Sequence, residues 1–244
     1  MNVKSSIASV LRHYPPLFRL SSRVYHRMNG GFRTLSPGTL DALDRAFALA
    51  RRERRGDIGD YYEFGLFRGR TFLHAYEACE RLDLQDTHLY GFDSFQGLPE
   101  VEDVDAAGGI FFAGQFAASR SEVEKHLTEH GLDWSRATLV EGFFDEVLTP
   151  QLKQSLPRRC AGVVLLDCDL YSSTIVSLEW LEDMLIDHAV VLFDDWTSYG
   201  GSGELGQQRA LAEFLDRHPR WVTDELWPFD RHGTAFRFRL RRPG

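Results

Sequence analysis

The chain has 244 residues, of which 43% are hydrophobic, and this is enough for one well-buried domain without requiring two. Its formal net charge is -8, so a general surface for nucleic-acid backbones is not expected, and small-molecule partners fit the composition better. No stretch approaches the roughly 20 apolar residues of a membrane span, and no apolar run of signal-peptide length lies near the first residue. We therefore expect a cytoplasmic protein that binds neither nucleic acid nor membrane.

The first 36 residues show no regular hydrophobic period. They contain Tyr14-Pro15-Pro16 and Gly30-Gly31, which favour irregular backbone. We expect residues 1–36 to form an arm that acts as a lid or packs on a second subunit, so that a homodimer is expected. A single domain over 37–244 follows, and apolar residues at helical spacing predict that it begins with a helix at Pro37.

After Gly56 the chain alternates between short apolar strands and amphipathic helices. Strands are predicted at Tyr61–Phe64, His88–Phe92, Thr138–Glu141, Val163–Leu166 and Val190–Phe193. Helices are predicted at 70–82, 120–130, 173–186 and 204–217, and the second opens with the capping-box pattern Ser121-x-x-Glu124. This alternation predicts an α/β fold, doubly wound, with a parallel sheet covered by helices on both faces.

The end of the chain has a different rhythm. Trp221–Trp227 and Thr234–Leu240 resemble strands, and the residues between them are too few for a helix. Such a pair forms an antiparallel hairpin. The sheet is therefore expected to be mostly parallel with antiparallel structure at one edge.

Two features suggest a cofactor with an adenosine group at the carboxyl ends of the first two strands. Gly65 and Gly69 bracket the turn after the first strand, where glycine lets backbone amides approach a ligand and the next helix begins. Asp93 ends the second strand, where an acid can accept hydrogen bonds from both ribose hydroxyls. The turn is not a GxGxxG motif, so glycines that only turn the chain, and an Asp that only caps a loop, remain open as alternatives.

Two acidic pairs follow two other strands, Asp167 with Asp169 and Asp194 with Asp195. If these strands are neighbours, their tips meet, and like charges about 4 Å apart repel by about 4 kcal/mol at an effective dielectric constant of 20. A hard divalent cation such as Mg²⁺ would relieve this repulsion, since no cysteine or histidine accompanies the pairs. The alternative is four surface acids, each solvated or paired with arginine.

Other enzymes also place a DxD motif after an apolar strand. A phosphatase of the haloacid dehalogenase type needs a lysine between its acidic pairs, but Lys4, Lys125 and Lys153 all precede the first pair. A glycosyltransferase uses DxD to hold a metal on a nucleotide sugar, which leaves the glycine turn and Asp93 unexplained. We keep that glycosyltransferase, and a catalytically silent cofactor-binding protein, as alternatives.

Five segments together resemble the macrocin O-methyltransferase family: EFGLFRGRTF, GFDSFQGLPE, VEGFFDEVL, LLDCDLYSST and VVLFDDW, over roughly residues 57–217. The resemblance implies a class I methyltransferase fold, which is Rossmann-like. It also implies a metal-dependent, S-adenosylmethionine-dependent enzyme of antibiotic biosynthesis that methylates a sugar hydroxyl of a natural-product glycoside.

The resemblance also assigns residues. The methionine part of the cofactor is expected at Glu63, Gly65, Gly69 and Thr71, the ribose at Asp93, and the adenine near Ser94, Gly142 and Phe143. The metal ligands are expected to be Asp167, Asp194 and Asp195. The chain departs from the family pattern at Cys168, Ser172 and Trp196, so the resemblance leaves the acceptor unidentified.

The reaction needs a base, because a sugar hydroxyl is a poor nucleophile until it loses its proton. No lysine lies in these motifs, so a carboxylate is expected as the base, either Asp167 or Asp169. Asp169 has a second possible role, as the cap of the helix that begins near Ser172. Glycines and phenylalanines at 108–118 suggest either a lid over the site or aromatic residues packed under an ordinary loop.

Overall fold

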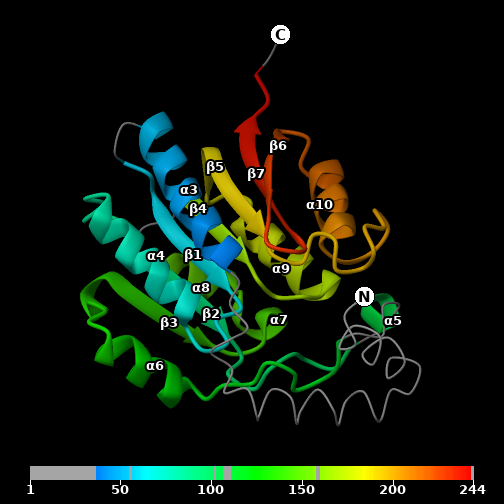
Figure 1. Cartoon of the computed structure of the whole chain (residues 1–244). Coiled ribbons are helices and arrows are strands. Elements are labelled where there is room, and N and C mark those ends of the chain that lie inside the picture. Colours follow the sequence, from blue (N-terminus) through cyan, green and yellow to red (C-terminus); the bar gives the residue numbers. More distant parts are fainter. Residues whose placement is uncertain (1–36, 55–56, 102, 107–110, 158–159, 243–244) are drawn as a thin grey trace, which may run out of the picture.

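The structure is a computed structural model that describes residues 37–54, 57–101, 103–106, 111–157 and 160–242 (Figure 1). The arm expected at residues 1–36 lies outside the described residues, so its lid or subunit-contact role stays a prediction.

One seven-stranded sheet runs through the molecule in the order β3-β2-β1-β4-β5-β7-β6. Its strands are β1 (Asp60–Phe64), β2 (Leu89–Asp93), β3 (Ala137–Glu141), β4 (Ala161–Leu166), β5 (Leu185–Phe193), β6 (Trp221–Phe229) and β7 (Gly233–Leu240). The first five strands pair in parallel, whereas β7 pairs antiparallel with both β5 and β6. The predicted mostly parallel sheet, with an antiparallel hairpin at one edge, is confirmed.

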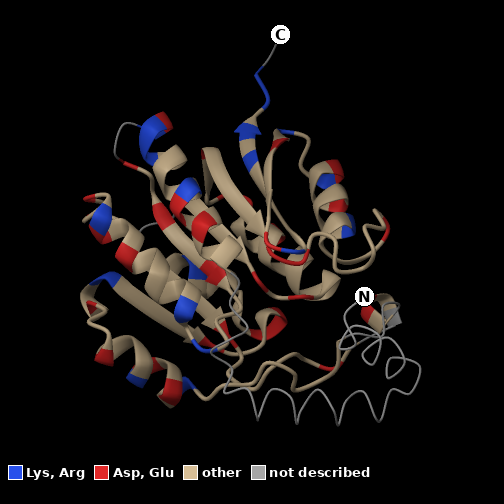
Figure 2. Ribbon diagram, in the orientation of Figure 1, with Lys and Arg blue, Asp and Glu red and all other residues tan. Residues whose placement is uncertain are grey.

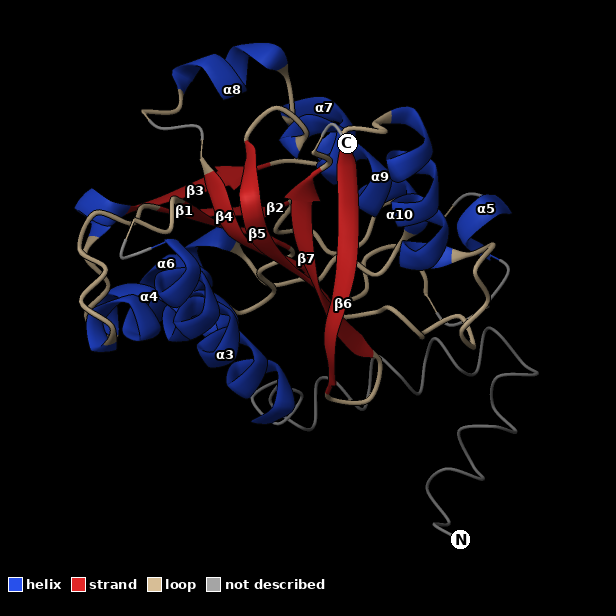
Figure 3. Ribbon diagram, turned by 90° about the horizontal axis from the view of Figure 1, so that it is seen from above, coloured by secondary structure: helices blue, strands red, loops and turns tan. Residues whose placement is uncertain are grey.

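Helices cover both faces of this sheet (Figure 3). One face carries α3 (Pro37–Arg54), α4 (Arg70–Arg81) and α6 (Arg120–Glu129), and the other carries α9 (Tyr171–Leu181) and α10 (Gly206–Arg217). Four short elements lie in the connections: α5 (Asp103–Ala106), a 3₁₀ turn (Trp134–Arg136), α7 (Phe144–Val147) and α8 (Pro150–Ser155).

The central strands are buried on both faces, and this explains their uninterrupted apolar sequences. Tyr61 packs in the hydrophobic cluster under α3 and α4, while its neighbour Tyr62 packs in the cluster under α9 and α10. Val163 and Val164 on β4 divide in the same way. Because successive side chains of a strand point to opposite faces, each apolar run contributes to both layers of the core.

The prediction of α9 was wrong at its end. The helix was expected to run to residue 186, but it ends at Leu181, and Leu185 already pairs with Ala161 as the start of β5. The register then shifts, so that Val163 pairs with Val190, and His188 adopts a positive φ of 68° in the intervening bulge. Met184 and Leu185 are buried, and their apolar character is compatible with either a helix end or a strand start.

The capping box of α6 was also placed incorrectly. The serine that caps the helix is Ser119, whose side chain accepts a hydrogen bond from the backbone N–H of Glu122, while the Glu122 carboxylate accepts one from the backbone N–H of Ser119. Glu124, expected to complete the box with Ser121, instead pairs with Arg120 at 2.7 Å. Both serine-glutamate pairs have the same spacing, so the pattern alone does not distinguish them.

Positively and negatively charged residues are intermixed along helices such as α6 and α10 (Figure 2). Pairs one turn apart, such as Arg209 with Glu213 on α10, account for part of this pattern. Among the described residues, no helix has the length and apolar character needed to cross a membrane.

The sheet reverses its strand order between β1 and β4, and the backbone there is unusually close. The N–H of Asp167 donates to the carbonyl of Phe64, and the N–H of Gly65 donates to the carbonyl of Phe92, both at 2.9 Å. Gly65 has a φ of 93°, and a methyl group there would lie 1.8 Å from the carbonyl oxygen of Asp167. Only glycine fits this position, which opens the crevice where ligands bind in such sheets.

A second close approach of backbone lies near the start of β4, and a substitution there tests it. A methyl group at Gly162, in β4, would lie 1.6 Å from the carbonyl oxygen of Ile58, so Gly162→Ala is expected to lower the free energy of unfolding by about 1–3 kcal/mol. Gly203→Ala is the control, because its nearest neighbour is 4.0 Å away. Urea denaturation of both variants measures the difference, and equal midpoints would contradict the packing described here.

Candidate functional site

A cavity of about 500 Å³ lies at the carboxyl ends of the parallel strands. Most of the site residues predicted from the sequence line it: Gly65, Asp93, Ser94, Gly142, Phe143, Asp167, Asp169, Asp194 and Asp195. The structure therefore brings the predicted cofactor region and the predicted metal region into one space. Glu63, Gly69 and Thr71 do not line it.

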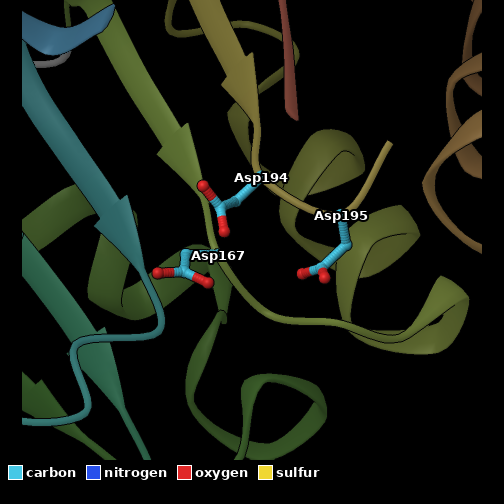
Figure 4. A group of neighbouring side chains, drawn as sticks. All are labelled: Asp167, Asp194 and Asp195. Atoms are coloured by element: carbon cyan, nitrogen blue, oxygen red, sulfur yellow. The ribbon is translucent and has the colours of Figure 1, made fainter. Parts of the chain in front are cut away.

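Three aspartates form the acidic cluster of this cavity. Asp167 follows β4, and Asp194 and Asp195 follow β5, which is its neighbour in the sheet. Their carboxylates face a common space (Figure 4), and one oxygen from each lies within 4.8 Å of the others. An all-oxygen donor set of this kind suits a hard divalent cation.

Neighbouring side chains hold the acidic cluster in place. Thr39, at the start of α3, donates its hydroxyl to Asp194 at 3.1 Å, and Ser198 donates to Asp195 at 2.8 Å. Gln207, fully buried on α10, accepts from the backbone N–H of Asp195 and donates to the carbonyl of Leu166, both at 3.0 Å. Gln207 thus ties the ends of β4 and β5 together.

Burial raises the pKa of all three acids, and the charges of neighbouring aspartates add to the rise for Asp167 and Asp194. Burial is the main cause that raises the pKa of Asp194 to about 7, and the charge of Asp195 is the second. Burial raises the pKa of Asp195 to about 6, and burial together with Asp194 and Asp195 holds the pKa of Asp167 well above its usual range. The cluster therefore retains protons near neutral pH, and a divalent cation would replace them.

Asp169 lies beside the cluster, with a φ of 62° and only 8% of its surface exposed. The proposal that it caps α9 is wrong, because Leu170 occupies the cap position without a side-chain bond. The carboxylate of Asp105 serves the helix instead, accepting from the N–H groups of Tyr171 at 2.6 Å and Ser172 at 3.2 Å. Asp169 remains free to face the cavity, and its role toward a substrate stays a prediction.

Asp105 and Gln207 were both missed in the sequence. Each is a polar residue that is almost or completely buried, at 2% and 0% exposure, and each bonds to backbone groups far away in the chain. The sequence contains one weak signal for Gln207, which lies at helical spacing from the apolar residues Ala210, Leu211 and Phe214 that α10 buries.

At the other end of the cavity, Asp93 connects two loops. One carboxylate oxygen accepts from the N–H groups of Leu66 at 2.7 Å and Phe67 at 3.0 Å, and the other accepts from Phe95 at 2.6 Å. A carboxylate has about four acceptor sites, so these bonds leave capacity for a further hydroxyl donor. Asp93 shapes the loop as well as lining the cavity, and its contact with ribose stays a prediction.

Glu63 lies beneath the glycine turn and is completely buried. It accepts hydrogen bonds from the hydroxyls of Tyr61 and Thr71, and burial raises its pKa to about 8. Gly69 has a φ of 72° at the start of α4. These contacts give Glu63, Gly69 and Thr71 a structural role in the turn, and the predicted contact with a methionine group stays untested.

Part of the predicted lid at 108–118 forms a wall of the site. Phe116 lines the cavity and packs edge-on against Phe67, with ring centroids 6.0 Å apart. Phe111 packs on Tyr199 at 5.7 Å, and Phe112 is buried. Residues 108–110 lie outside the described residues, so the prediction of a moving lid stays open.

Comparison with known proteins places this site in a family. The model of the macrocin-O-methyltransferase (TylF) family matches residues 39–238. The chain belongs to the macrocin O-methyltransferase family. The match spans the whole cavity, from Thr39 on α3 to the β6–β7 hairpin, and it confirms the resemblance seen in the sequence.

Individual relatives agree with this assignment. The chain is 25% identical to mycinamicin III 3''-O-methyltransferase of Micromonospora griseorubida, over 75% of this chain and 70% of that one. Its fold is similar to that of the O-methyltransferase NovP, with a TM-score of 0.68 and 23% identity over 83% of this chain and 79% of that one. It also resembles the O-methyltransferase TomG of Streptomyces achromogenes, solved in complex with SAM, with a TM-score of 0.51 and 15% identity over 89% and 96% of the two chains. The class I methyltransferase fold expected from the sequence is thereby confirmed.

The pKa shifts predict how stability depends on pH. Because the pKa values of Asp194 and Asp195 are raised in the folded state, that state binds more protons between pH 4 and about 7 than the unfolded chain. The cluster therefore lowers the stability of metal-free protein as pH rises through this window. Asp194→Asn is expected to be more stable than wild type at pH 7.5, by about 1–3 kcal/mol, and similar to it at pH 4.

Chemical denaturation in the presence of a chelator measures this effect. Asp224→Asn is the matched control, because Asp224 pairs with Arg239 and its pKa is lowered, so the same change there is expected to be destabilising. A metal-free Asp194→Asn variant that is less stable than wild type at pH 7.5 would contradict the repulsion inferred for the cluster.

Proposed function

We propose that this protein is a divalent-metal-dependent O-methyltransferase that transfers the methyl group of S-adenosylmethionine to a sugar hydroxyl of a natural-product glycoside. The observation that carries the proposal is the position of the acidic cluster in the same cavity as the glycine turn and Asp93. Membership of the macrocin O-methyltransferase family supports the reaction class.

The cofactor is assigned to the end of the cavity lined by Gly65, Asp93, Ser94, Gly142 and Phe143. Gly65 keeps the backbone open there, Asp93 has acceptor capacity for ribose hydroxyls, and Phe143 offers an aromatic surface for adenine. The SAM complex of TomG, which has a similar fold, supports this choice of cofactor.

The metal, which we propose to be Mg²⁺, is assigned to Asp167, Asp194 and Asp195. The residues fit such an ion, because their oxygens converge and one of them, Oδ2 of Asp195, is buried without a hydrogen-bond partner among the described residues. When bound, a divalent cation lowers the pKa of a coordinated hydroxyl and fixes its orientation.

Asp169 is the proposed base. Among the described residues that line the cavity there is no lysine, arginine or histidine, so the proton of the acceptor hydroxyl has to pass to a carboxylate. Asp167 holds the metal in this proposal. Asp169 lies two positions further along the chain and also lines the cavity, so it is the remaining candidate of the two. Asp169 is expected to hold the hydroxyl and take its proton as the methyl group is transferred.

The acidic lining also bears on the glycosyltransferase alternative. A nucleotide sugar carries a diphosphate, which such enzymes usually meet with basic side chains in addition to a metal. The described lining has acidic side chains and no lysine, arginine or histidine, and this favours an uncharged or cationic acceptor. The mycinamicin relative, whose name states methylation at a 3'' position, supports a glycoside.

Titration calorimetry of chelator-treated protein tests the two binding assignments. Wild type is expected to bind S-adenosylmethionine and Mg²⁺, and Asp194→Asn is expected to lose Mg²⁺ binding while retaining the cofactor. Asp224→Asn, outside the cavity lining, is the control and should bind both. Failure of wild type to bind S-adenosylmethionine would overturn the proposal, and binding of uridine diphosphate glucose instead would favour a glycosyltransferase.

Asp169→Asn tests the base. Methyl transfer from labelled cofactor, assayed with glycosides that carry neighbouring hydroxyls, is expected to fall at least 100-fold in kcat, since a positioned base contributes about 10²–10⁴. Cofactor and Mg²⁺ affinities are expected to change little. A kcat within a few-fold of wild type would exclude Asp169 as the base.

A further inference from the structure

Thr39 links the first turn of α3 to the acidic cluster. It is the third residue of the helix, and only 3% of its surface is exposed. Its hydroxyl lies 3.1 Å from Oδ1 of Asp194, although the two residues are 155 positions apart in the chain. It also lines the cavity. A buried hydroxyl aimed at a proposed metal ligand is the feature from which the inference starts.

The position of this hydroxyl is fixed by the rest of the helix. Ala42, Leu43, Ala46 and Phe47, the next residues of α3 that face the sheet, are completely buried in the core. At the start of the helix, a methyl group on Gly38 would lie 2.7 Å from the backbone nitrogen of Asp230, in the β6–β7 turn. The first turn is therefore held on two sides, and the Thr39 hydroxyl has little freedom to follow Asp194 if that side chain moves.

The bond distinguishes the two oxygens of Asp194. Oδ1 accepts the Thr39 hydroxyl, and this bond restricts the rotation of the carboxylate. Asp195 is held in a similar way: Ser198 donates to Oδ1, while Oδ2 has no hydrogen-bond partner in the part of the chain that the structure describes. Hydrogen bonds of this kind orient metal ligands before the ion arrives. The start of α3 also presents the positive end of a helix dipole to the carboxylates.

We propose that Thr39 is a positioning residue for the metal ligand Asp194, so that the affinity for the divalent cation depends on how the first turn of α3 is seated. The inference rests on the proposed metal site. It adds to that site a residue outside the strand ends that sets the orientation of one ligand. Thr39 itself does not contact the ion in this scheme.

The test compares two substitutions at Thr39. Thr39→Val keeps the shape but removes the hydroxyl, and it is expected to weaken Mn²⁺ binding about 10-fold, the lower end of the effect of losing such a partner. Thr39→Ser keeps the hydroxyl and is expected to bind Mn²⁺ within about twofold of wild type. Thr87→Val removes the hydroxyl of a buried threonine outside the cavity lining. It controls for the general effect of replacing a buried threonine with valine and should bind Mn²⁺ like wild type.

Binding is measured by titration of chelator-treated protein with Mn²⁺ alone, followed by electron paramagnetic resonance of the free ion. S-adenosylhomocysteine affinity, measured in parallel, reports whether each variant is folded. Unchanged Mn²⁺ affinity in Thr39→Val would overturn the inference if Asp194→Asn abolishes binding. Unchanged affinity in Asp194→Asn would overturn the metal site itself, and with it the inference. Equal losses in Thr39→Val and Thr39→Ser would assign Thr39 a packing role and also overturn it.

Discussion

The electrostatic repulsion among the carboxylates at the ends of β4 and β5 is the constraint on which this site depends. Parallel pairing places the two strand ends side by side, so Asp167, Asp194 and Asp195 converge whether or not a cation is present. Burial makes their charges costly, as the raised pKa values show. Such a concentration of buried acid stabilises nothing by itself. A divalent cation bound among the three carboxylates would offset their repulsion.

The surrounding structure holds the acids where they repel one another. Gln207 fixes the two strand ends, Ser198 and Thr39 each hold one oxygen, and Asp105 seats the first turn of α9 next to Asp169. These contacts come from different layers of the fold, since α3 covers one face of the sheet and α9 and α10 cover the other. The cluster is therefore preorganised by both layers, which is the arrangement expected of a site that must bind an ion in one geometry.

The proposed cofactor region depends on a different property, the close approach of backbone segments. Gly65 has no room for a side chain, and Asp93 accepts three backbone hydrogen bonds that draw the β1 and β2 loops together. Glu63 supports the same turn from below, and burial raises its pKa to about 8. The cavity thus has a tightly turned backbone at one end and a cluster of three aspartates at the other. In the proposed reaction, the first end would hold the cofactor and the second would hold the cation.

The sequence by itself determined the class of fold and the main acids of the site. Buried parallel strands require continuous apolar runs, and acids that follow such runs must lie at one edge of the sheet. Tertiary structure alone decided where α9 ends, which serine caps α6, and that Thr39, Asp105 and Gln207 serve the site. Two serine-glutamate pairs with the same spacing cannot be distinguished from the sequence, whereas the folded chain uses only Ser119 and Glu122. A contact between Thr39 and Asp194 leaves no periodic trace in the chain, because it exists only after the helix has packed against the sheet.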